Sequence, residues 1–353
     1  MENAIYRIID ANFNRAREAL RVMEEFCRFA LNSKPLSART KQLRHQLSNS
    51  IRQFDSGRLI SSRDTVSDVG VNNQIEEQRT RQDLQDCFTA ACKRLVEALR
   101  VLSEITQTQD RTIAVDMERL RYEAYTLEKD IVLLSEPLEK YRNVELYIIL
   151  TSDLPSEIFA LAHKCAIGGA DCIQLRSKNM PDDILFSVAN EFVKICKDSN
   201  VISIINDRVD ISIASDADGV HFGQNDLPIS CIYQLQLKPM IIGKSTHSLA
   251  QLESTCQENP TYVGLGPVFS TMTKPSVEPV GLEYVEQAVK KLADYSIGHA
   301  AIGGITLDNV EQVLSAGADC ISVCQAVTKT SDPAGACGLF KEKIKSFKEK
   351  NRA

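Results

Sequence analysis

The chain has 353 residues, of which 43% are apolar and 25% charged, proportions that are ordinary for a globular protein. Its formal net charge is −6 without any long run of like charge, which argues against a nucleic-acid partner or a basic membrane-binding patch. No segment approaches the roughly eighteen apolar residues of a membrane span, and the N-terminus lacks the apolar stretch of a signal peptide. Eleven cysteines without a CxxC pair predict reduced thiols. We therefore expect a cytoplasmic protein.

Residues 1–135 have the periodicity of helices, with apolar side chains three and four positions apart in segments 12–31 and 82–105. Only two of the sixteen glycines precede residue 150. The pentapeptide EALRV at 18–22 recurs at 97–101, and flanking residues agree at the same offset. We interpret this part as a duplicated helical hairpin, an all-helical domain whose four main helices pack as a bundle.

A polar loop, GRLISSRDTVSDVG at 57–70, separates the two repeats. Its hydroxyls and the guanidinium of Arg63 could hold an anion. The alternative, which we favour on chemistry alone, is a connecting loop in which Ser62 or Asp64 caps a turn.

From residue 143 to residue 353 short apolar runs alternate with helix-like segments. Strands that alternate with helices pair in parallel, and eight such units predict an α/β fold, a closed (β/α)8 TIM barrel. An open doubly wound sheet is the competing architecture, but its glycine-rich dinucleotide fingerprint is absent after the first run. The eight runs are 145–151, 172–178, 202–207, 219–224, 240–247, 262–269, 299–305 and 320–327.

Polar side chains end these runs, at the rim where barrels of this type carry their active sites. They are Gln174, Arg176, Lys178, Asn206, Asp207, Gln224, Asp226, Ser245, His247, Thr271, Thr273, Lys274, Gly303, Gly304 and Gln325. Asp207 and Asp226 follow neighbouring strands, separated by one βα repeat, and we expect them to converge. Two like charges repel unless a cation lies between them, and two carboxylates with water and phosphate oxygens suit Mg²⁺. For either aspartate alone, an ordinary turn role would explain the residue.

Positive charge gathers on the same rim. Arg176, Lys178 and Lys274 offer donors for phosphate oxygens. Gly303 and Gly304 would offer backbone amides ahead of a helix to a second phosphate, although a tight turn explains them equally well.

The rim lacks a triad of nucleophile, base and orienting group. The sequence pairs neither His221 nor His247 with an obvious carboxylate, and we expect both to have local or packing roles. Metal ligands and cations without a base favour departure of a diphosphate, whose growing charge they would neutralise.

The motifs QLRSK, INDRVDISIASDADGVHFGQNDLP, GLGPVFSTMTK and AIGGI resemble those of the thiamine-phosphate synthase family, in the same order and over roughly residues 143–345. That family joins the diphosphate of hydroxymethylpyrimidine to thiazole phosphate and releases diphosphate. The resemblance implies a transferase of thiamine biosynthesis with two small-molecule substrates. It also implies a dissociative reaction, in which the thiazole nitrogen captures the cation left on the pyrimidine methylene. Monomer and homo-oligomer both stay open.

The resemblance implies roles for individual residues. Asp207 and Asp226 match the Mg²⁺ ligands. Contacts to the pyrimidine diphosphate are implied for Gln174, Arg176, Lys178, Asn206, Ser245 and Lys274, with Arg176, Lys178 and Lys274 as the catalytic cations. Contacts to the thiazole phosphate are implied for Thr271, Thr273, Gly304, Cys324 and Gln325.

The last strand departs from the family pattern. A small apolar residue and a serine are usual where Cys324 and Gln325 stand. If a backbone amide makes the contact there, the side chain of Gln325 can point away. If the serine hydroxyl makes it, the affinity for phosphate should be lower in this chain.

NRAREALRVMEE and SSRDTVSDVG resemble a small helical domain that precedes the synthase in some bacteria. The resemblance implies action on hydroxymethylpyrimidine phosphate, as its kinase. No P-loop or other nucleotide signature occurs, and a stabilising or dimerising appendage is an equal alternative.

Two alternatives concern the barrel. A thiazole tautomerase would not need the two aspartates or the cationic clamp of Arg176, Lys178 and Lys274. A sensor of thiamine precursors could dispense with groups that act only in the transition state. Because all these groups are present, the sequence favours the synthase.

Overall fold

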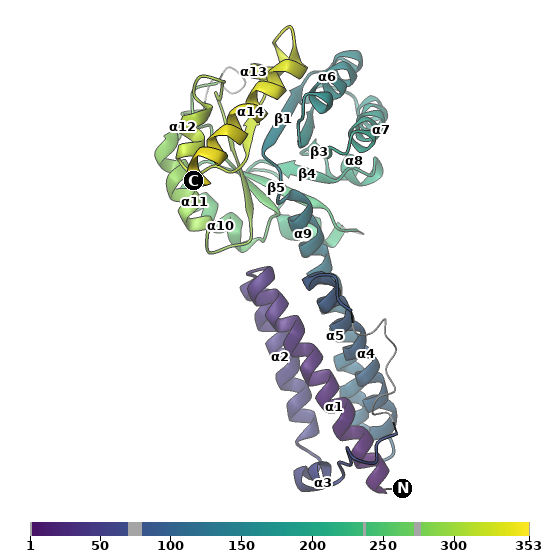
Figure 1. Ribbon diagram of the computed structural model, residues 1–353. Helices are drawn as coiled ribbons and strands as arrows, with labels where there is room; N and C mark the ends of the chain where they lie inside the picture. The colour runs from purple at the N-terminus through teal and green to yellow at the C-terminus, as the bar shows by residue number, and fades with distance from the viewer. Residues whose placement is uncertain (1, 70–79, 236–237, 272–276, 353) are drawn as a thin grey trace. The chain divides into compact units, whose positions relative to one another are not determined.

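The computed structural model of the chain describes residues 2–69, 80–235, 238–271 and 277–352 (Figure 1). The chain divides into two compact units, Met1–Val132 and Leu133–Ala353. In the described part of the chain, no helix has both the length and the apolar character that crossing a membrane requires.

The first unit is helical, as the periodicity predicts. Its elements are α1 (Glu2–Glu25), the π-helical turn η1 (Phe26–Ala30), α2 (Lys34–Ile51), α3 (Ser56–Ser61), α4 (Leu84–Thr106) and the first part of α5 (Arg111–Tyr141). The helix α1 packs against both α2 and α4, and it buries Leu20 and Met23 completely. Hydrogen bonds from Ser50 to Asp116 and from Arg39 to Asp130 join α2 to α5. The four long helices therefore form the bundle that the repeat predicts.

The predicted loop at 57–70 begins as the helix α3, and the residues that follow α3 have the capping role that the chemistry of the loop favoured. The Oδ1 atom of Asp64 accepts the N–H of Ser67 at 2.9 Å, and the hydroxyl of Ser62 donates to the carbonyl of Leu59 at 2.8 Å. The guanidinium of Arg63 is occupied by Asp10, to which it donates two hydrogen bonds of 2.7 and 2.8 Å. A neutralised guanidinium is poorly suited to hold a further anion.

The second unit is a closed barrel of eight parallel strands in chain order, so the predicted fold is confirmed. Each strand begins within one residue of a predicted run and, except for β1, ends before that run does. The strands are β1 (Leu146–Thr151), β2 (Cys172–Arg176), β3 (Ile202–Asn206), β4 (Gly219–Phe222), β5 (Ile241–Thr246), β6 (Tyr262–Leu265), β7 (Gly298–Ile302) and β8 (Ile321–Val323).

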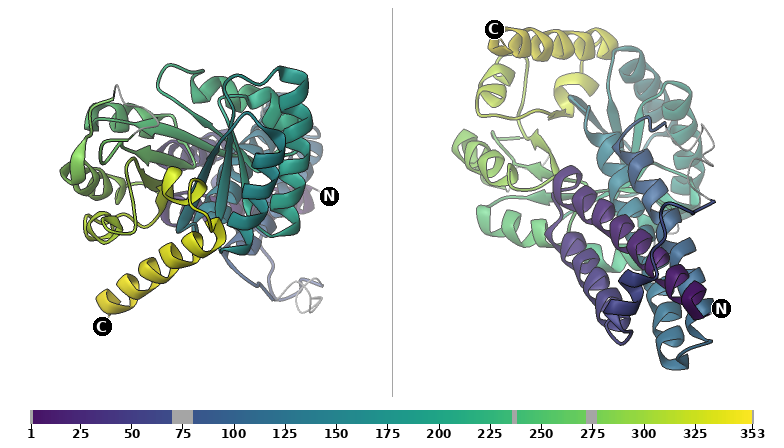
Figure 2. Two further views of the ribbon diagram at one scale, coloured as in Figure 1. Left: turned by 90° about the horizontal axis from the view of Figure 1, so that it is seen from above. Right: turned by 60° about the horizontal axis from the view of Figure 1, so that its bottom comes forward.

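Helices surround this ring of strands (Figure 2). They are α6 (Pro155–Ile167), α7 (Asp182–Asp198), α8 (Val209–Ala214), α9 (Ile229–Leu235), α10 (Leu249–Gln257), α11 (Gly281–Leu292), α12 (Val310–Ser315), α13 (Gln325–Thr328) and α14 (Pro333–Arg352).

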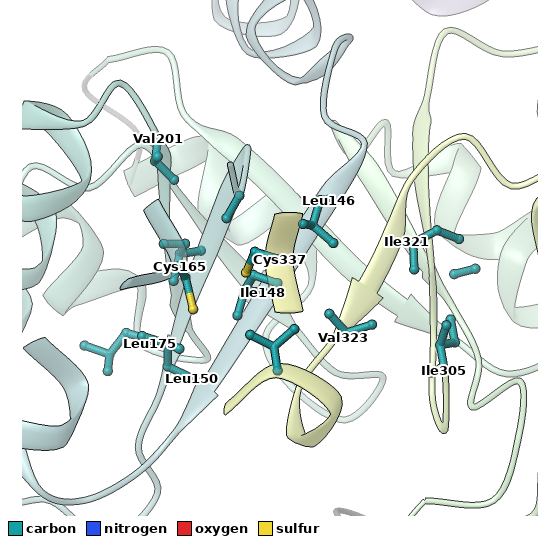
Figure 3. Packing of buried hydrophobic residues seen from close by; sticks show 14 of the residues in the cluster. Leu146, Ile148, Leu150, Cys165, Leu175, Val201, Ile305, Ile321, Val323 and Cys337 are labelled. Atoms are coloured by element: carbon teal, nitrogen blue, oxygen red, sulfur yellow. The ribbon is translucent and has the colours of Figure 1, made fainter. Parts of the chain in front are cut away.

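Alternate strand residues serve two different cores, because successive side chains point to opposite faces of a sheet. Ile148, Leu150 and Val323 belong to the outer core with the helices, where Cys165 and Cys337 also pack (Figure 3). The inner core includes Tyr147, Ile149, Cys172, Ile204 and Tyr262. The barrel is thus packed through its centre, and the site must lie at one end.

The last part of α5 belongs to the barrel unit. This helix runs from Arg111 to Tyr141 through the boundary between the two units, and Tyr141 and Val144 belong to the inner core of the barrel. The ring of Tyr141 stacks on that of Tyr262 with centroids 4.3 Å apart. The predicted domain bounds, 1–135 and 143–353, stay a prediction of where each part would fold alone.

Candidate active site at the carboxyl ends of the strands

The turn after β3 places the first predicted metal ligand. Asn206 is the last residue of β3, and Asp207 follows with a φ of +61°, a left-handed conformation that aspartate tolerates better than most residues. The N–H of Asp207 donates to the carbonyl of His221 on β4 at 2.8 Å. This bond fixes the start of the loop and holds Asp207 beside the neighbouring strand.

The loop after β4 brings the second aspartate to the first. The Oδ2 atom of Asp226 accepts the N–H of Gly223 at 2.6 Å, which folds the loop back on the end of β4. Burial raises the pKa of Asp207, and the charge of Asp226 and a hydrogen bond between the two carboxyl groups raise it further. Lys178 and Arg176 lower the pKa of Asp207, so both cations lie near this pair. The structure therefore brings together four of the predicted site residues.

Two crowded carboxyl groups repel each other when both are charged, and a divalent cation between them relieves this repulsion. Among the described residues, no group of three or more His, Cys, Asp and Glu side chains is arranged to hold a metal. Two carboxylates alone are an incomplete ligand set, which is what Mg²⁺ usually has before water and phosphate oxygens complete it. Asp207 and Asp226 fit Mg²⁺ in this respect.

Gln174 and Ser245 are joined by Tyr147, Tyr262 and His221, none of which the sequence placed in the site. Gln174 is buried, and its Nε2 donates to the hydroxyl of Tyr147 at 2.8 Å. That hydroxyl bonds the hydroxyl of Tyr262 at 2.8 Å, and His221 bonds both Tyr262 and Ser245 at 2.9 Å. His221 therefore has more than the packing role expected of it. Period-two alternation along each strand indicates that these residues face inward, but it does not indicate which of them contact one another.

Two other rim residues have local roles. The ring Nδ1 of His247 bonds the carbonyl of Gly266, in agreement with the local role expected of it. Gln224 donates from Nε2 to the carbonyl of Ser245 at 2.6 Å and so joins the ends of β4 and β5.

The loops after β6 and β7 lie against each other. The N–H of Phe269 donates to the carbonyl of Gly303 at 2.9 Å. Gly304 has a φ of +65°, and a Cβ there would lie 2.5 Å from the carbonyl oxygen of Ser270. Thr271 is partly buried nearby in the chain, whereas Thr273 and Lys274 lie outside the described residues.

The glycine pair lies ahead of a helix, as expected, but is separated from it by a turn. Helix α12 begins only at Val310, well after Gly304, so the pair does not open a helix. Instead the carbonyl of Gly304 accepts a hydrogen bond from Asn309 at 2.9 Å, which shapes a turn. The positive φ and the close approach of Ser270 explain the glycine at 304.

The last strand leaves its unusual residues at the rim. Cys324 follows β8, and its sulfur lies 3.8 Å from the hydroxyl of Thr151 at the end of β1. Gln325 begins α13 and is exposed. An exposed side chain agrees with the alternative in which Gln325 points away and leaves only its backbone amide for a ligand.

Comparisons with known proteins cover both units. Residues 146–327 match the family model described as thiamine monophosphate synthase, and residues 7–130 match that of the ThiD2 family. The thiamine-phosphate synthase of Synechocystis sp. is 37% identical over 334 residues, which span 94% of each chain. That of Gloeobacter violaceus is 35% identical and spans 97% of this chain and 98% of its own.

A solved structure agrees with the barrel. The thiamine phosphate pyrophosphorylase from Pyrococcus furiosus superposes with a TM-score of 0.54 at 30% identity, over 58% of this chain and 98% of its own. Its match covers a share of this chain similar to that of the barrel unit. The family model, the full-length relatives and the fold agree, and the chain belongs to the thiamine monophosphate synthase family.

Proposed function

We propose that the barrel makes thiamine phosphate from the diphosphate of hydroxymethylpyrimidine and thiazole phosphate, with release of diphosphate. Family membership supports the reaction class. The observation that carries the proposal is the contact of Asp207 with Asp226 beside Arg176 and Lys178, because a departing diphosphate needs such a combination of metal ligands and cations.

In the proposed reaction the bond between the pyrimidine methylene carbon and the diphosphate oxygen breaks, and the diphosphate keeps the electron pair. The thiazole nitrogen then forms the new C–N bond. Arg176, Lys178 and Lys274 would neutralise the charge that grows on the leaving oxygens. Mg²⁺ held by Asp207 and Asp226 would supply further charge neutralisation when bound. No protein nucleophile takes part.

The remaining rim residues would bind and orient the substrates. Gln174, Asn206 and Ser245 would contact the pyrimidine diphosphate, since they stand on the inner faces or ends of β2, β3 and β5. The thiazole phosphate would contact Gly304 after β7, Cys324 after β8 and Gln325 at the start of α13. The family resemblance adds Thr271 and Thr273 to this set.

We also propose a cytoplasmic location. All eleven cysteines have free thiols, and Cys172, Cys196 and Cys337 are among those that are fully buried. A chain with this many unpaired thiols suits a reducing compartment.

The test uses the purified full chain with both substrates, and thiamine phosphate is measured by mass spectrometry. We expect product with Mg²⁺, none with EDTA, and recovery when Mg²⁺ is added in excess. Asp226→Asn should lower kcat by on the order of 10²- to 10³-fold while the thermal unfolding temperature stays the same. Asp198→Asn, an exposed change at the far end of α7, is the control and should retain full turnover.

The alternatives predict other outcomes. A thiazole tautomerase would isomerise thiazole phosphate without the pyrimidine and would tolerate Asp226→Asn. A sensor would bind either precursor without turnover. Product formation that is independent of metal and of Asp226 would overturn the site assignment even if the activity is confirmed.

A further inference from the structure

A continuous chain of hydrogen bonds crosses the interior of the barrel. It runs from Gln174 on β2 to Tyr147 on β1, then to Tyr262 on β6, His221 on β4 and Ser245 on β5, with four distances of 2.8 to 2.9 Å. Tyr147 and Tyr262 are at most 2% exposed. We call these five residues the relay, because its two ends are side chains that we place against the substrate.

The backbone makes room for the phenol rings of the relay. A Cβ at Gly243 would overlap Cζ of Tyr262, so the ring of Tyr262 occupies the space that a side chain on β5 would need. The ring of Tyr141 stacks on that of Tyr262 at an interplanar angle of 8°. Gly298 leaves room for the Tyr141 ring, because a Cβ at Gly298 would lie 2.8 Å from that ring. The hydroxyl of Tyr141 contacts Cys320 at 3.8 Å. The position of Tyr262 is therefore fixed from two sides.

We assign the direction of the relay from its first donor. The amide nitrogen of Gln174 donates to the hydroxyl of Tyr147, and we assign the single hydrogen of that hydroxyl to its bond with Tyr262. Burial raises the pKa of both phenols well above the usual 10, and both keep their protons. With this assigned direction Tyr262 donates to Nδ1 of His221, and the tautomer that results carries its hydrogen on Nε2 and donates it to Ser245.

Two consequences follow at the rim. Ser245 accepts from His221, which leaves the serine's own hydrogen available to donate to a substrate oxygen. Because Nε2 of Gln174 donates to Tyr147, its carbonyl oxygen is the atom that Gln174 can offer to a substrate donor. The relay thus determines which end of Gln174 and which hydrogen of Ser245 meets the substrate.

We propose that Tyr147, Tyr262 and His221 are positioning residues that orient Gln174 and Ser245. In this proposal Tyr141, at the end of α5, fixes the ring of Tyr262 by stacking on it. The proposal rests on the proposed function, in which Gln174 and Ser245 contact the pyrimidine diphosphate. It assigns a role to the inward face of five strands and to the last residue of α5.

The test compares two substitutions that each remove one buried hydroxyl. Tyr262→Phe keeps the ring stack but interrupts the relay. Tyr284→Phe is the matched control, because the Tyr284 hydroxyl is also buried and donates to Thr246 at 2.8 Å outside the relay. Both variants are measured as full chains for kcat, for KM of the pyrimidine diphosphate, for thermal unfolding and for the ¹⁵N shifts of the histidines.

We expect Tyr262→Phe to lower kcat at least tenfold and to shift the His221 resonances away from a single Nε2–H tautomer. Tyr284→Phe should change neither. Tyr147→Phe is the second variant if Tyr262→Phe does not fold, and it should raise KM for the pyrimidine diphosphate through Gln174. Tyr141→Phe should recover most of the turnover that Tyr141→Leu loses, because it restores the stacked ring.

If Tyr262→Phe has the same kcat, KM and His221 tautomer as the wild type, the proposed relay is overturned. The proposed function is not affected by that result. If the wild type makes no thiamine phosphate, the proposed function fails instead. The tautomer shift in Tyr262→Phe, and its absence in Tyr284→Phe, would still support or refute the hydrogen-bonded chain on its own.

Discussion

At the scale of single residues, the two aspartates act both as turn residues and as site residues. Asp207 takes a left-handed φ directly after its strand, and Asp226 closes a short loop onto the N–H of Gly223. Either observation alone would satisfy a purely structural explanation. Their mutual contact, and the raised pKa that burial and the second carboxyl group give Asp207, are what a turn does not require.

The ring of Tyr262 leaves no room for a side chain at position 243, which is a glycine. An alanine Cβ there would overlap the ring of Tyr262, which is fully buried and stacked from below. We expect Gly243→Ala to destabilise the barrel by about 3 kcal/mol, as overpacking does in a closed core. Thermal and urea unfolding of the full chain would measure the change.

Gly338 gives the matched control within the same unit. It lies inside α14, and a Cβ there would meet nothing within 4 Å. Because alanine is the better helix former, Gly338→Ala should stabilise the chain by about 0.5–1 kcal/mol. Two glycine-to-alanine changes with the same effect on stability would contradict this account of Gly243.

At the scale of elements, one lysine joins α14 to the amino ends of β1 and β2. Lys341 donates to Glu145 at 2.9 Å and to Asp171 at 3.0 Å. Asp171 in turn accepts the backbone N–H groups of Glu145 and Leu146. We expect Lys341→Met to lower the free energy of unfolding by about 1 kcal/mol at pH 7, since these groups are only partly buried.

The pH dependence of this difference in unfolding free energy tests whether the contacts of Lys341 with carboxylates cause it. Burial alone would raise the pKa of Glu145, but hydrogen bonds from Lys341 and Lys348 outweigh it and hold this pKa below 4.5. A lowered carboxyl pKa adds stability above its unfolded value and loses it as the pH falls through the folded value. The difference between wild type and Lys341→Met should therefore shrink below about pH 4.5. Lys345→Met, an exposed change on the same helix, should show no such difference at any pH.

The sequence predicted the elements well, because strand-forming runs and helical periodicity are local properties. All eight runs form strands, and every strand except β1 ends before the predicted run does. Lys178, Asp207 and His247 belong to predicted runs but lie beyond the strands, on the loops that form the rim. A hydrophobic pattern does not mark where the ladder ends and the loop begins.

What the sequence did not predict is the set of contacts across the barrel. Tyr147 and Tyr262 resemble ordinary β-strand residues, and the partners of His221 in the relay lie far from it in sequence. Tyr147 and Tyr262 themselves belong to distant strands, and only closure of the barrel brings them together. The roles of Gln174 and Ser245 could be inferred from a motif, whereas the side chains that hold them could not.

At the scale of the whole molecule, α5 belongs to both units in sequence. Its final residues, Leu133 to Tyr141, fall within the barrel unit, although the predicted barrel domain begins at 143. A chain of residues 143–353 lacks Tyr141 and leaves uncovered the face of the Tyr262 ring on which Tyr141 stacks. We expect it to be less stable than residues 133–353 by about 3 kcal/mol or more, the usual cost of losing a buried aromatic ring.

Urea unfolding of the two shortened chains, followed by circular dichroism, would measure this difference. Tyr141→Leu within residues 133–353 separates loss of the ring from loss of the helix. Equal stability of the two chains would mean that the predicted bound at 143 is a sufficient start for the barrel.

Closure of the barrel also sets an order of events during synthesis. The register that seals the ring pairs Leu146 with Ile321, which belong to the first and the last strand of the barrel. The helical unit ends at Val132, so its contacts are available before any strand has been made. On the ribosome, β1 therefore emerges with one edge open, and β2 can cover the other edge long before β8 exists. Until the last strand has been made, that open edge is the part of the nascent chain most exposed to pairing with another molecule.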